Sequence, residues 1–378
     1  MKTVVIAGYA RSPFTPAKKG ELARVRPDDL VAQVVRGLVA RTGVKTSDIE
    51  DLVLGCAFPE GEQGLNLARL VVFLAGLPQS VAGATVNRFC GSSMQSIHQA
   101  AGAIQLGAGE AFICAGVESM TRVPMMGFNP MPNPALVAEM PNAYIGMGDT
   151  AENVASKWGL SRKAQEEFAV TSHRKAAAAQ ANGNFADEIV PIHDGKREIK
   201  QDGCIRAETT SEGLAELKPA FSQAGSVTAG TSSPLTDGAS AVLVCTQDYA
   251  ARNGLTPLAK IASVAVAGCA PEIMGIGPVA ATNKALARAG ITADKLDVVE
   301  LNEAFASQSL ACIHDLKLDL AKINLDGGAI ALGHPLGATG ARIVGKAASL
   351  LKRTGGRYAL ATQCIGGGQG IATILEAL

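Results

Sequence analysis

The chain has 378 residues, of which 47% are hydrophobic, 18% are charged and 4% are aromatic. Its 34 basic residues balance 34 acidic ones, so no net charge favours a nucleic acid or an anionic membrane surface as partner. The length exceeds what one hydrophobic core usually supports, and we expect two or three domains.

The eight cysteines are scattered and form no C-x-x-C pair. This spacing argues against a zinc site and against a disulfide framework, so we expect no metal and a reducing compartment. The first residues, MKTVVIAGYARSP, contain an apolar run that is too short for a signal peptide and predict a first strand. No apolar stretch reaches transmembrane length. We therefore expect a cytoplasmic protein without membrane insertion.

The next segment is repeated later in the chain. Residues 38–56 align with residues 285–303, and Gly43 then matches Gly290. Each copy predicts an amphipathic helix, a glycine stop, a turn and an apolar strand. Both halves continue with a glycine-rich turn, a helix and further apolar strands. This alternation favours an α/β fold with two parallel sheets, each covered on both faces.

Cys90 lies in VNRFCGSSMQSIHQAAGAIQLG, where a short strand ends and a helix begins. The helix is predicted by capping hydroxyls at Ser92 and Ser93 and by apolar residues at helical spacing. A thiol at a helix N-terminus meets the positive end of the dipole and unpaired N–H groups, and both favour the thiolate. Because cysteine is also a common buried residue, a nucleophile and a core residue are equal alternatives at this point.

Residues 120–236 interrupt the first half between its last two strands. The insert contains proline-rich turns, a helical stretch SRKAQEEFAVTSHRKAAAAQANG and a polar tract. An insertion at the rim of a sheet is a usual way to build a lobe that covers a substrate. We expect that role for this segment.

Two polar clusters open the second half. In ELNEAFA, at 300–306, an apolar strand ends at Asn302, for which a helix N-cap is the simpler alternative. In GGAIALGHPLGATGARI, at 327–343, His334 occupies the counterpart of the Cys90 loop. The repeat therefore predicts that His334 and Cys90 lie near each other where the two halves meet.

The last cluster is CIGGGQG, at 364–370, in which Cys364 ends a strand and three glycines expose backbone N–H groups. A plain turn is the structural alternative. No G-K-[ST] follows, and no strand–GxGxxG–helix unit is present, so an oxyanion site is favoured over a phosphate cradle. Two thiols, a histidine and an asparagine suit one reaction: one thiolate accepts an acyl group, while the other thiol moves a proton beside a thioester carbonyl.

Four motifs, VNRFCGSSMQ, NEAFA, GGAIALGHPLGATGAR and CIGGGQG, occur in the order and at the approximate separations found in the thiolases. The chain resembles this family over essentially its whole length. The resemblance implies a thiolase fold, in which duplicated domains form a five-layered αβαβα core and an inserted loop domain binds coenzyme A. It places the N-terminal domain at 1–119 plus 237–268, the loop domain at 120–236 and the C-terminal domain at 269–378.

The resemblance also implies catalytic roles. Cys90 would carry the acyl group, His334 would activate it, and Cys364 would be the acid/base at the substrate's α-carbon. Asn302 would position a water that forms one oxyanion site with His334. The backbone N–H groups of Cys90 and Gly366 would form the other.

Four more residues are implied as coenzyme A contacts. Ser233 resembles the serine that meets the pantetheine, Arg206 an arginine near the adenine, and Met147 and Phe305 residues that line the pocket. Coenzyme A and acyl-CoA would be substrates, with no tightly bound cofactor. The family further implies a homodimer or homotetramer and, as a candidate partner, a hydratase/dehydrogenase of β-oxidation.

Two departures bear on the subtype. Biosynthetic acetoacetyl-CoA enzymes have a histidine where this chain has Gly146, and Pro234 replaces a small residue. The segments VPMMGFNPMPNP, IRAETTSEGLAELKPAF and GCAPEIMGIGPVAA resemble degradative 3-ketoacyl-CoA thiolases. We therefore expect ping-pong cleavage of 3-ketoacyl-CoA to acetyl-CoA and a shortened acyl-CoA through an acyl-Cys90 intermediate.

Three alternatives stay open. The first is the biosynthetic condensation of two acetyl-CoA molecules, which would use the same residues. The second is a ketoacyl-ACP synthase, which would need a second histidine where Cys364 stands. The third is a non-enzymatic lipid carrier on the same scaffold, which is disfavoured because all four catalytic positions are intact.

Overall fold

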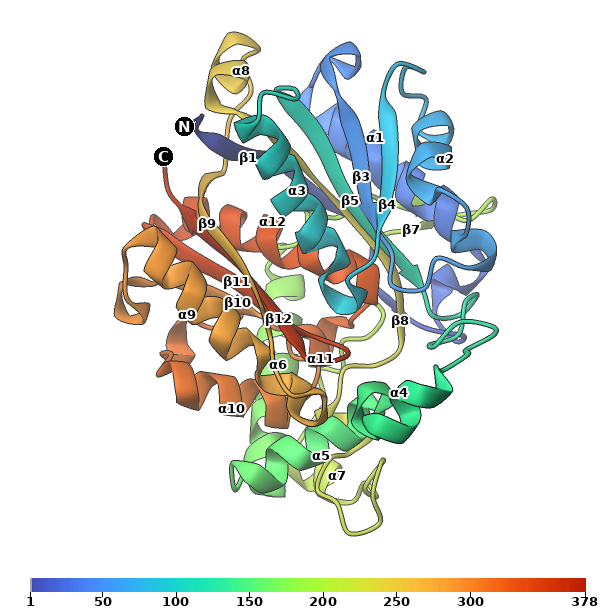
Figure 1. The fold of residues 1–378 in the computed structure, drawn as a ribbon, viewed down its shortest axis with the longest axis vertical. Helices are drawn as coiled ribbons and strands as arrows, with labels where there is room; N and C mark the ends of the chain where they lie inside the picture. The colour runs from blue at the N-terminus through green and yellow to red at the C-terminus, as the bar shows by residue number, and fades with distance from the viewer. Residues whose placement is uncertain (1) are drawn as a thin grey trace.

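A ten-stranded mixed sheet runs through the computed structural model, which describes residues 2–378 (Figure 1). Its strands, with a separate small pair, are β1 (Val4–Arg11), β2 (Thr15–Pro16), β3 (Asp51–Gly55), β4 (Ala82–Val86), β5 (Ala111–Ser119), β6 (Ile192–His193), β7 (Glu198–Ile199), β8 (Thr236–Thr246), β9 (Ala259–Gly268), β10 (Val298–Leu301), β11 (Tyr358–Ile365) and β12 (Gln369–Glu376). The order across the sheet is β10-β11-β12-β9-β1-β8-β5-β3-β4, with β2 beside β8. Strands β6 and β7 pair only with each other.

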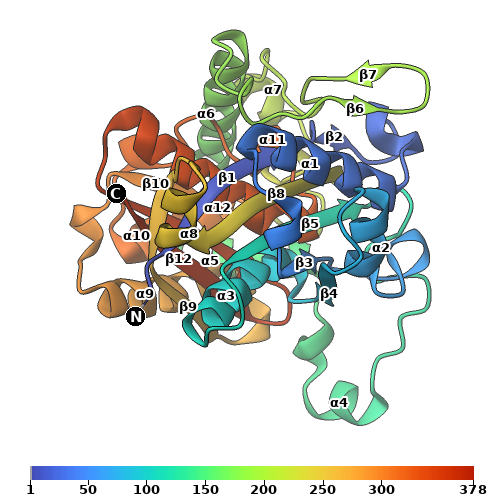
Figure 2. The ribbon, with the colours of Figure 1, turned by 90° about the horizontal axis from the view of Figure 1, so that it is seen from above.

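The helices cover both faces of this sheet and build the insert. They are α1 (Pro27–Thr42), α2 (Leu67–Leu74), α3 (Ser92–Gln105), α4 (Pro134–Glu139), α5 (Met147–Lys157), α6 (Arg162–Ala181), α7 (Ser211–Ala215), α8 (Gln247–Arg252), α9 (Gly277–Ala289), α10 (Ala306–Leu316), α11 (Ala329–Leu332) and α12 (Leu336–Thr354). Helices α1 and α2 pack on the outer face of the strands β1, β8, β5, β3 and β4. Helices α3 and α12 lie between these strands and the strands β9, β12, β11 and β10, whose outer face is covered by α9 and α10 (Figures 1 and 2). The predicted five-layered αβαβα fold is confirmed.

The internal repeat is visible in the backbone. Helices α1 and α9 both end at a glycine in the left-handed conformation, Gly43 with φ 67° and Gly290 with φ 69°. This conformation is easy for glycine and closes a helix. A short turn and a strand then follow in each half, β3 in the first and β10 in the second. The counterpart of β4 in the second half is reduced to a single parallel bridge between Val299 and Ile323.

The expectation of purely parallel sheets is wrong. Strand β3 runs parallel to β4 and β5, and β10 runs parallel to β11, but β8 and β12 are antiparallel to both of their neighbours. Strand β12 follows β11 through a three-residue turn, which is too short for a parallel crossover. Strand β8 starts opposite the end of β5, with Ser119 paired to Asp237, because the insert returns the chain to the point it left.

The insert occupies residues between β5 and β8, as the sequence predicts, and its longest helix, α6, packs on α10 and α11 of the second half. The predicted domain boundaries stay a prediction. Strand β9 is assigned to the first domain by the boundary at 268, yet it pairs along its length with β12 and over only two positions with β1. This pairing favours a second half that starts at β9. Among residues 2–378, no helix has the length and apolarity needed to cross a membrane.

Buried ion pairs fix the insert to the core. Arg11 of β1 contacts Glu188 at 2.8 Å and Asp202 at 2.7 Å, and both carboxylates belong to the insert. Lys346 of α12 lies 2.9 Å from Glu188 and 2.7 Å from Asp326. Because breaking a buried pair leaves an uncompensated charge at a cost of about 3–5 kcal/mol, this network sets the position of the insert over the junction of the halves.

Candidate active site

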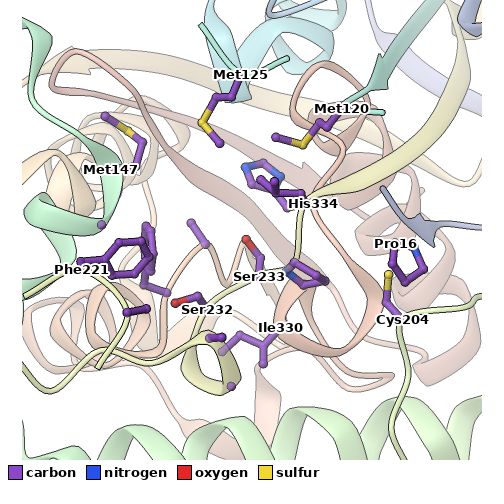
Figure 3. Close-up of a pocket in the computed structure, with 18 of the residues that line it drawn as sticks. Pro16, Met120, Met125, Met147, Cys204, Phe221, Ser232, Ser233, Ile330 and His334 are labelled. Atoms are coloured by element: carbon purple, nitrogen blue, oxygen red, sulfur yellow. The ribbon is translucent and has the colours of Figure 1, made fainter. Parts of the chain in front are cut away.

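A cavity of about 700 Å³ lies between the insert and the two halves (Figure 3). Cys90, His334 and Cys364 all line it, although they come from distant parts of the sequence. Cys90 lies two residues before α3 and His334 two residues before α12, so the two central helices start at the same cavity. Cys364 stands near the end of β11, the strand that carries the glycine turn.

The turn that carries Cys90 is strained. Phe89 has a φ of +42°, a left-handed conformation that is unfavourable for a residue with a bulky side chain. The Asn87 side chain holds the turn, since its oxygen accepts the Phe89 N–H at 2.8 Å and its amide donates to the Ala57 carbonyl at 2.9 Å. Strain at a fixed loop of this kind is common where a side chain must be presented to a site.

The prediction that Ser92 and Ser93 cap α3 is wrong. The N-cap position is Gly91, with no side-chain cap. The Ser92 hydroxyl donates to the Phe89 carbonyl at 2.6 Å and so braces the strained turn. The Ser93 hydroxyl accepts the Ala341 N–H of α12 at 2.8 Å and so joins the two central helices. Both hydroxyls are engaged by partners that sequence spacing alone does not reveal.

Burial controls the protonation of Cys90. It raises the pKa of the thiol to about 11, against the opposing effect of hydrogen bonds from the N–H groups of Gly366 and of Cys90 itself. The negative charge of Glu118 makes a smaller contribution in the same direction as burial. Burial therefore outweighs the N–H groups in setting the direction of the pKa shift, and the thiolate expected at the helix N-terminus stays a prediction.

His334 is held in one tautomer by Thr339. The Thr339 hydroxyl donates to the Pro335 carbonyl at 3.2 Å, so it accepts from Nδ1–H of His334 at 2.6 Å. Nε2 then carries the lone pair. The Asn302 amide donates to Nε2 at 3.4 Å. The structure thus brings Asn302 and His334 into contact from two separate motifs.

The imidazole is neutral. Burial, together with a smaller contribution from the positive charge of Arg342, lowers the pKa of His334 to about 3. Cys90 and His334 are therefore a thiol and a neutral imidazole at neutral pH. Such a pair can pass a proton when the sulfur attacks, without first separating charge in a buried site.

The glycine turn after β11 reaches across to Cys90. Gly367 and Gly368 have φ values of +79° and +83°, which explains why glycines are needed there. The Gly366 N–H donates to the Cys90 sulfur, and the Gln363 amide donates to the Cys90 carbonyl. Burial raises the pKa of Cys364 well above its ordinary value, and the nearby Cys90 adds to this effect.

The residues predicted to bind coenzyme A share the cavity. Ser233, Arg206, Met147 and Phe305 all line it, and Figure 3 shows Ser233 pointing into it beside His334. The ring of Phe305 packs against Phe221 in an edge-on arrangement with centroids 5.9 Å apart. Asn302 and Gly366 do not line the cavity but contact residues that do.

Sequence reasoning missed Glu118, Gln363 and Thr339. The Glu118 carboxylate is buried and accepts the N–H groups of Ala57 at 2.8 Å and of Gly337 at 3.0 Å, so it joins the Cys90 side of the site to the start of α12. A carboxylate that ends the otherwise apolar strand AFICAGVES is a signal that could have pointed to it. Thr339 and Gln363 offered no comparable signal, because neither residue type is unusual at its place in the sequence.

Family models cover nearly the whole chain. The model described as "Thiolase, N-terminal domain" matches residues 4–248, and "Thiolase, C-terminal domain" matches residues 255–377. This chain belongs to the thiolase family. The resemblance read from the four motifs is thereby confirmed.

Individual relatives of this thiolase agree with the family models. A "3-ketoacyl-CoA thiolase" of Bacillus subtilis is 49% identical over 389 aligned residues, with both chains covered in full. A protein of the same name from a Marinomonas species is 50% identical and covers 99% of this chain and 98% of its own. The crystal structure of human mitochondrial 3-ketoacyl-CoA thiolase superposes with a TM-score of 0.92 at 37% identity, over 100% of this chain and 99% of that one.

Proposed function

We propose that this thiolase cleaves 3-ketoacyl-CoA with coenzyme A to give acetyl-CoA and an acyl-CoA shortened by two carbons. One observation carries the proposal: Cys90, His334 and Cys364 converge on a single cavity whose walls include the candidate coenzyme A contacts. The name borne by the full-length relatives supports this substrate class.

In the first half-reaction the Cys90 sulfur attacks the 3-keto carbon while its proton passes to Nε2 of His334. The bond between carbons 2 and 3 breaks, and the acyl group stays on Cys90 as a thioester. The electron pair of that bond leaves with the acetyl-CoA fragment as an enolate. The Cys364 thiol protonates its carbon 2, which releases acetyl-CoA and leaves a Cys364 thiolate.

In the second half-reaction the thiol of a new coenzyme A gives its proton to the Cys364 thiolate and attacks the acyl-Cys90 carbonyl. The tetrahedral intermediate expels the Cys90 sulfur, which recovers a proton from His334. An acyl-CoA leaves, and both cysteines return to their starting state. The release of one product before the second substrate reacts makes the kinetics ping-pong.

Two donor sets suit the oxygens that become negative. Gly366 and Cys90 direct backbone N–H groups at the nucleophile's side of the cavity. On the other side, Asn302 has a buried side-chain oxygen without a hydrogen-bond partner among the described residues, which suits an ordered water beside His334. Loss of one such donor typically costs about 100- to 1000-fold in rate.

The cleavage direction is tested with a homologous series. The chain is assayed with coenzyme A and 3-ketoacyl-CoA substrates of four to twelve carbons, and acetyl-CoA formation is followed by chromatography. We expect turnover beyond the four-carbon substrate, with parallel double-reciprocal plots. Turnover of acetoacetyl-CoA alone would favour the biosynthetic alternative, and no turnover of any member would refute the proposal.

We further infer a homo-oligomer built through β4. This strand ends the ten-stranded sheet, its residues AGATV carry no charge, and all five are partly or fully exposed. An unprotected edge beside the exposed Phe73 and Leu74 of α2 suits pairing with a second copy. Light scattering of the wild-type chain and of Thr85→Pro tests this, since a proline in the edge would leave only the monomer. A cytoplasmic location and a hydratase/dehydrogenase partner stay predictions.

A further inference from the structure

We propose that the acyl chain beyond the reacting carbons leaves Cys90 along Met120 and Leu336, and that Met125 at the open end sets the chain-length preference. This inference rests on the proposed function. It concerns the part of the substrate that neither the catalytic residues nor the coenzyme A contacts address.

The direction follows from the acyl-enzyme. After cleavage the acyl group is bonded to the Cys90 sulfur, while the space towards Ser233 must admit the pantetheine of the next coenzyme A. The chain therefore needs an exit away from Ser233. In Figure 3, Met120 and Met125 lie on the opposite side of His334 from Ser233, and both line the same cavity as Cys90.

The inner part of this branch is apolar and fixed. Cys90, Met120 and Leu336 belong to one buried cluster, in which Met120 is 4% exposed and Leu336 9% exposed. The Thr236 N–H donates to the Met120 sulfur at 3.4 Å and holds that side chain in place. A fixed apolar floor next to the nucleophile suits the first methylenes of an acyl chain.

The outer part is open and adaptable. Met125 lines the cavity but is 41% exposed, and between Val123 and Gly148 the only charged residue is Glu139. Methionine is unbranched and flexible, so it can follow chains of different length. A chain long enough to reach Met125 gains its contact there, so this side chain decides which chain lengths are favoured.

The test replaces Met125 with a side chain that fills the branch. In Met125→Trp, kcat/KM for the four-carbon substrate should stay within about twofold of wild type, because the chain left on Cys90 is only acetyl. For the ten-carbon substrate we expect a loss of about tenfold or more, since burial of each methylene is worth a factor of about four. Acylation of Cys90 by octanoyl-CoA, measured by intact mass, should slow in parallel, while acylation by acetyl-CoA should not.

Met131→Trp is the matched control. Met131 lies in the same segment, is 81% exposed and does not line the cavity, so its replacement should leave the whole chain-length profile unchanged. Equal losses on four and ten carbons in Met125→Trp, or the same profile in both variants, would overturn the inference while the proposed function stands. If the wild-type chain cleaved no 3-ketoacyl-CoA, the proposed function would fail, and this inference with it.

Discussion

The Cys90 loop and the His334 loop occupy equivalent positions in the two halves, but one fixes a backbone and the other fixes a side chain. Each loop leads into a central helix, α3 or α12, and each lines the same cavity. In the Cys90 loop the backbone is held in place: Phe89 is strained, its N–H donates to the Asn87 side chain, and the Gln363 amide donates to the Cys90 carbonyl. In the His334 loop a side chain, that of Thr339, fixes the ring.

In the proposed mechanism, this difference divides one reaction between the two copies of a duplicated unit. Burial raises the pKa of Cys90 to about 11 and lowers that of His334 to about 3, so both loops favour the uncharged form. A nucleophile needs its backbone fixed so that N–H groups can meet the developing oxyanion, whereas a base needs its lone pair aimed. The same fold position supplies each need through different neighbours.

The largest effect should come from removing the sulfur. In Cys90→Ser the hydroxyl is a far weaker nucleophile in this site, so we expect thiolysis to fall by roughly 10⁴-fold or more. Folding should persist because the change is nearly isosteric. Labelled acetyl-CoA should leave no label on the protein, and retained label would contradict the role of Cys90. Cys269→Ser, a half-buried thiol that does not line the cavity, is the control that should keep activity.

The next effect separates the two thiols. Cys364→Ala should still accept an acyl group on Cys90 from acyl-CoA, as seen by intact mass. Exchange of the acetyl-CoA methyl protons with deuterated solvent should fall by about 100- to 10,000-fold, the usual range for loss of a general acid/base. Exchange at the wild-type rate would mean that another group moves this proton.

A smaller effect should follow from releasing the imidazole. Thr339→Val keeps the size of the side chain but removes the acceptor of Nδ1–H, so the tautomer with a lone pair on Nε2 is no longer favoured. By analogy with other groups that orient a histidine, we expect kcat to fall by roughly 10- to 100-fold, with little change in KM for coenzyme A. Thr354→Val, at the far end of α12, is the control and should leave kcat unchanged. Equal losses in both variants would show a stability effect only.

Much of this site was predictable, because its chemistry lies in long motifs at strand and helix ends. The repeat placed Cys90 and His334 at one junction without any knowledge of the fold. Thr339 and Gln363 could not be predicted, since the contact of Thr339 with His334 and that of Gln363 with the Cys90 carbonyl leave no periodic signal in the sequence. The antiparallel direction of β12 has another cause. Alternating strands and helices indicate parallel strands, whereas the short turn at Gly366–Gly368 leaves no room for the crossover that a parallel pair needs.

The claim that both loops favour an uncharged side chain is tested most directly by the protonation of Cys90. If burial dominates and holds the thiol pKa near 11, the thiolate fraction rises about tenfold with each pH unit through pH 10. Alkylation of Cys90 by iodoacetamide, followed on its peptide by mass spectrometry, should then rise by about the same factor between pH 9 and pH 10. In the denatured chain the alkylation rate of the same peptide should be half-maximal at about pH 8.5, the ordinary pKa of a thiol, and should level off about one pH unit higher.

A plateau in the alkylation rate of Cys90 below pH 9 in the folded chain would contradict the dominance of burial. It would mean that the N–H groups of Gly366 and Cys90, together with the start of α3, outweigh burial and hold a thiolate at rest. The Cys90 loop would then favour a charged form and the His334 loop a neutral one. In that case the reaction would begin with attack by a preformed thiolate, and His334 would act mainly as a donor to the oxyanion, not as the base.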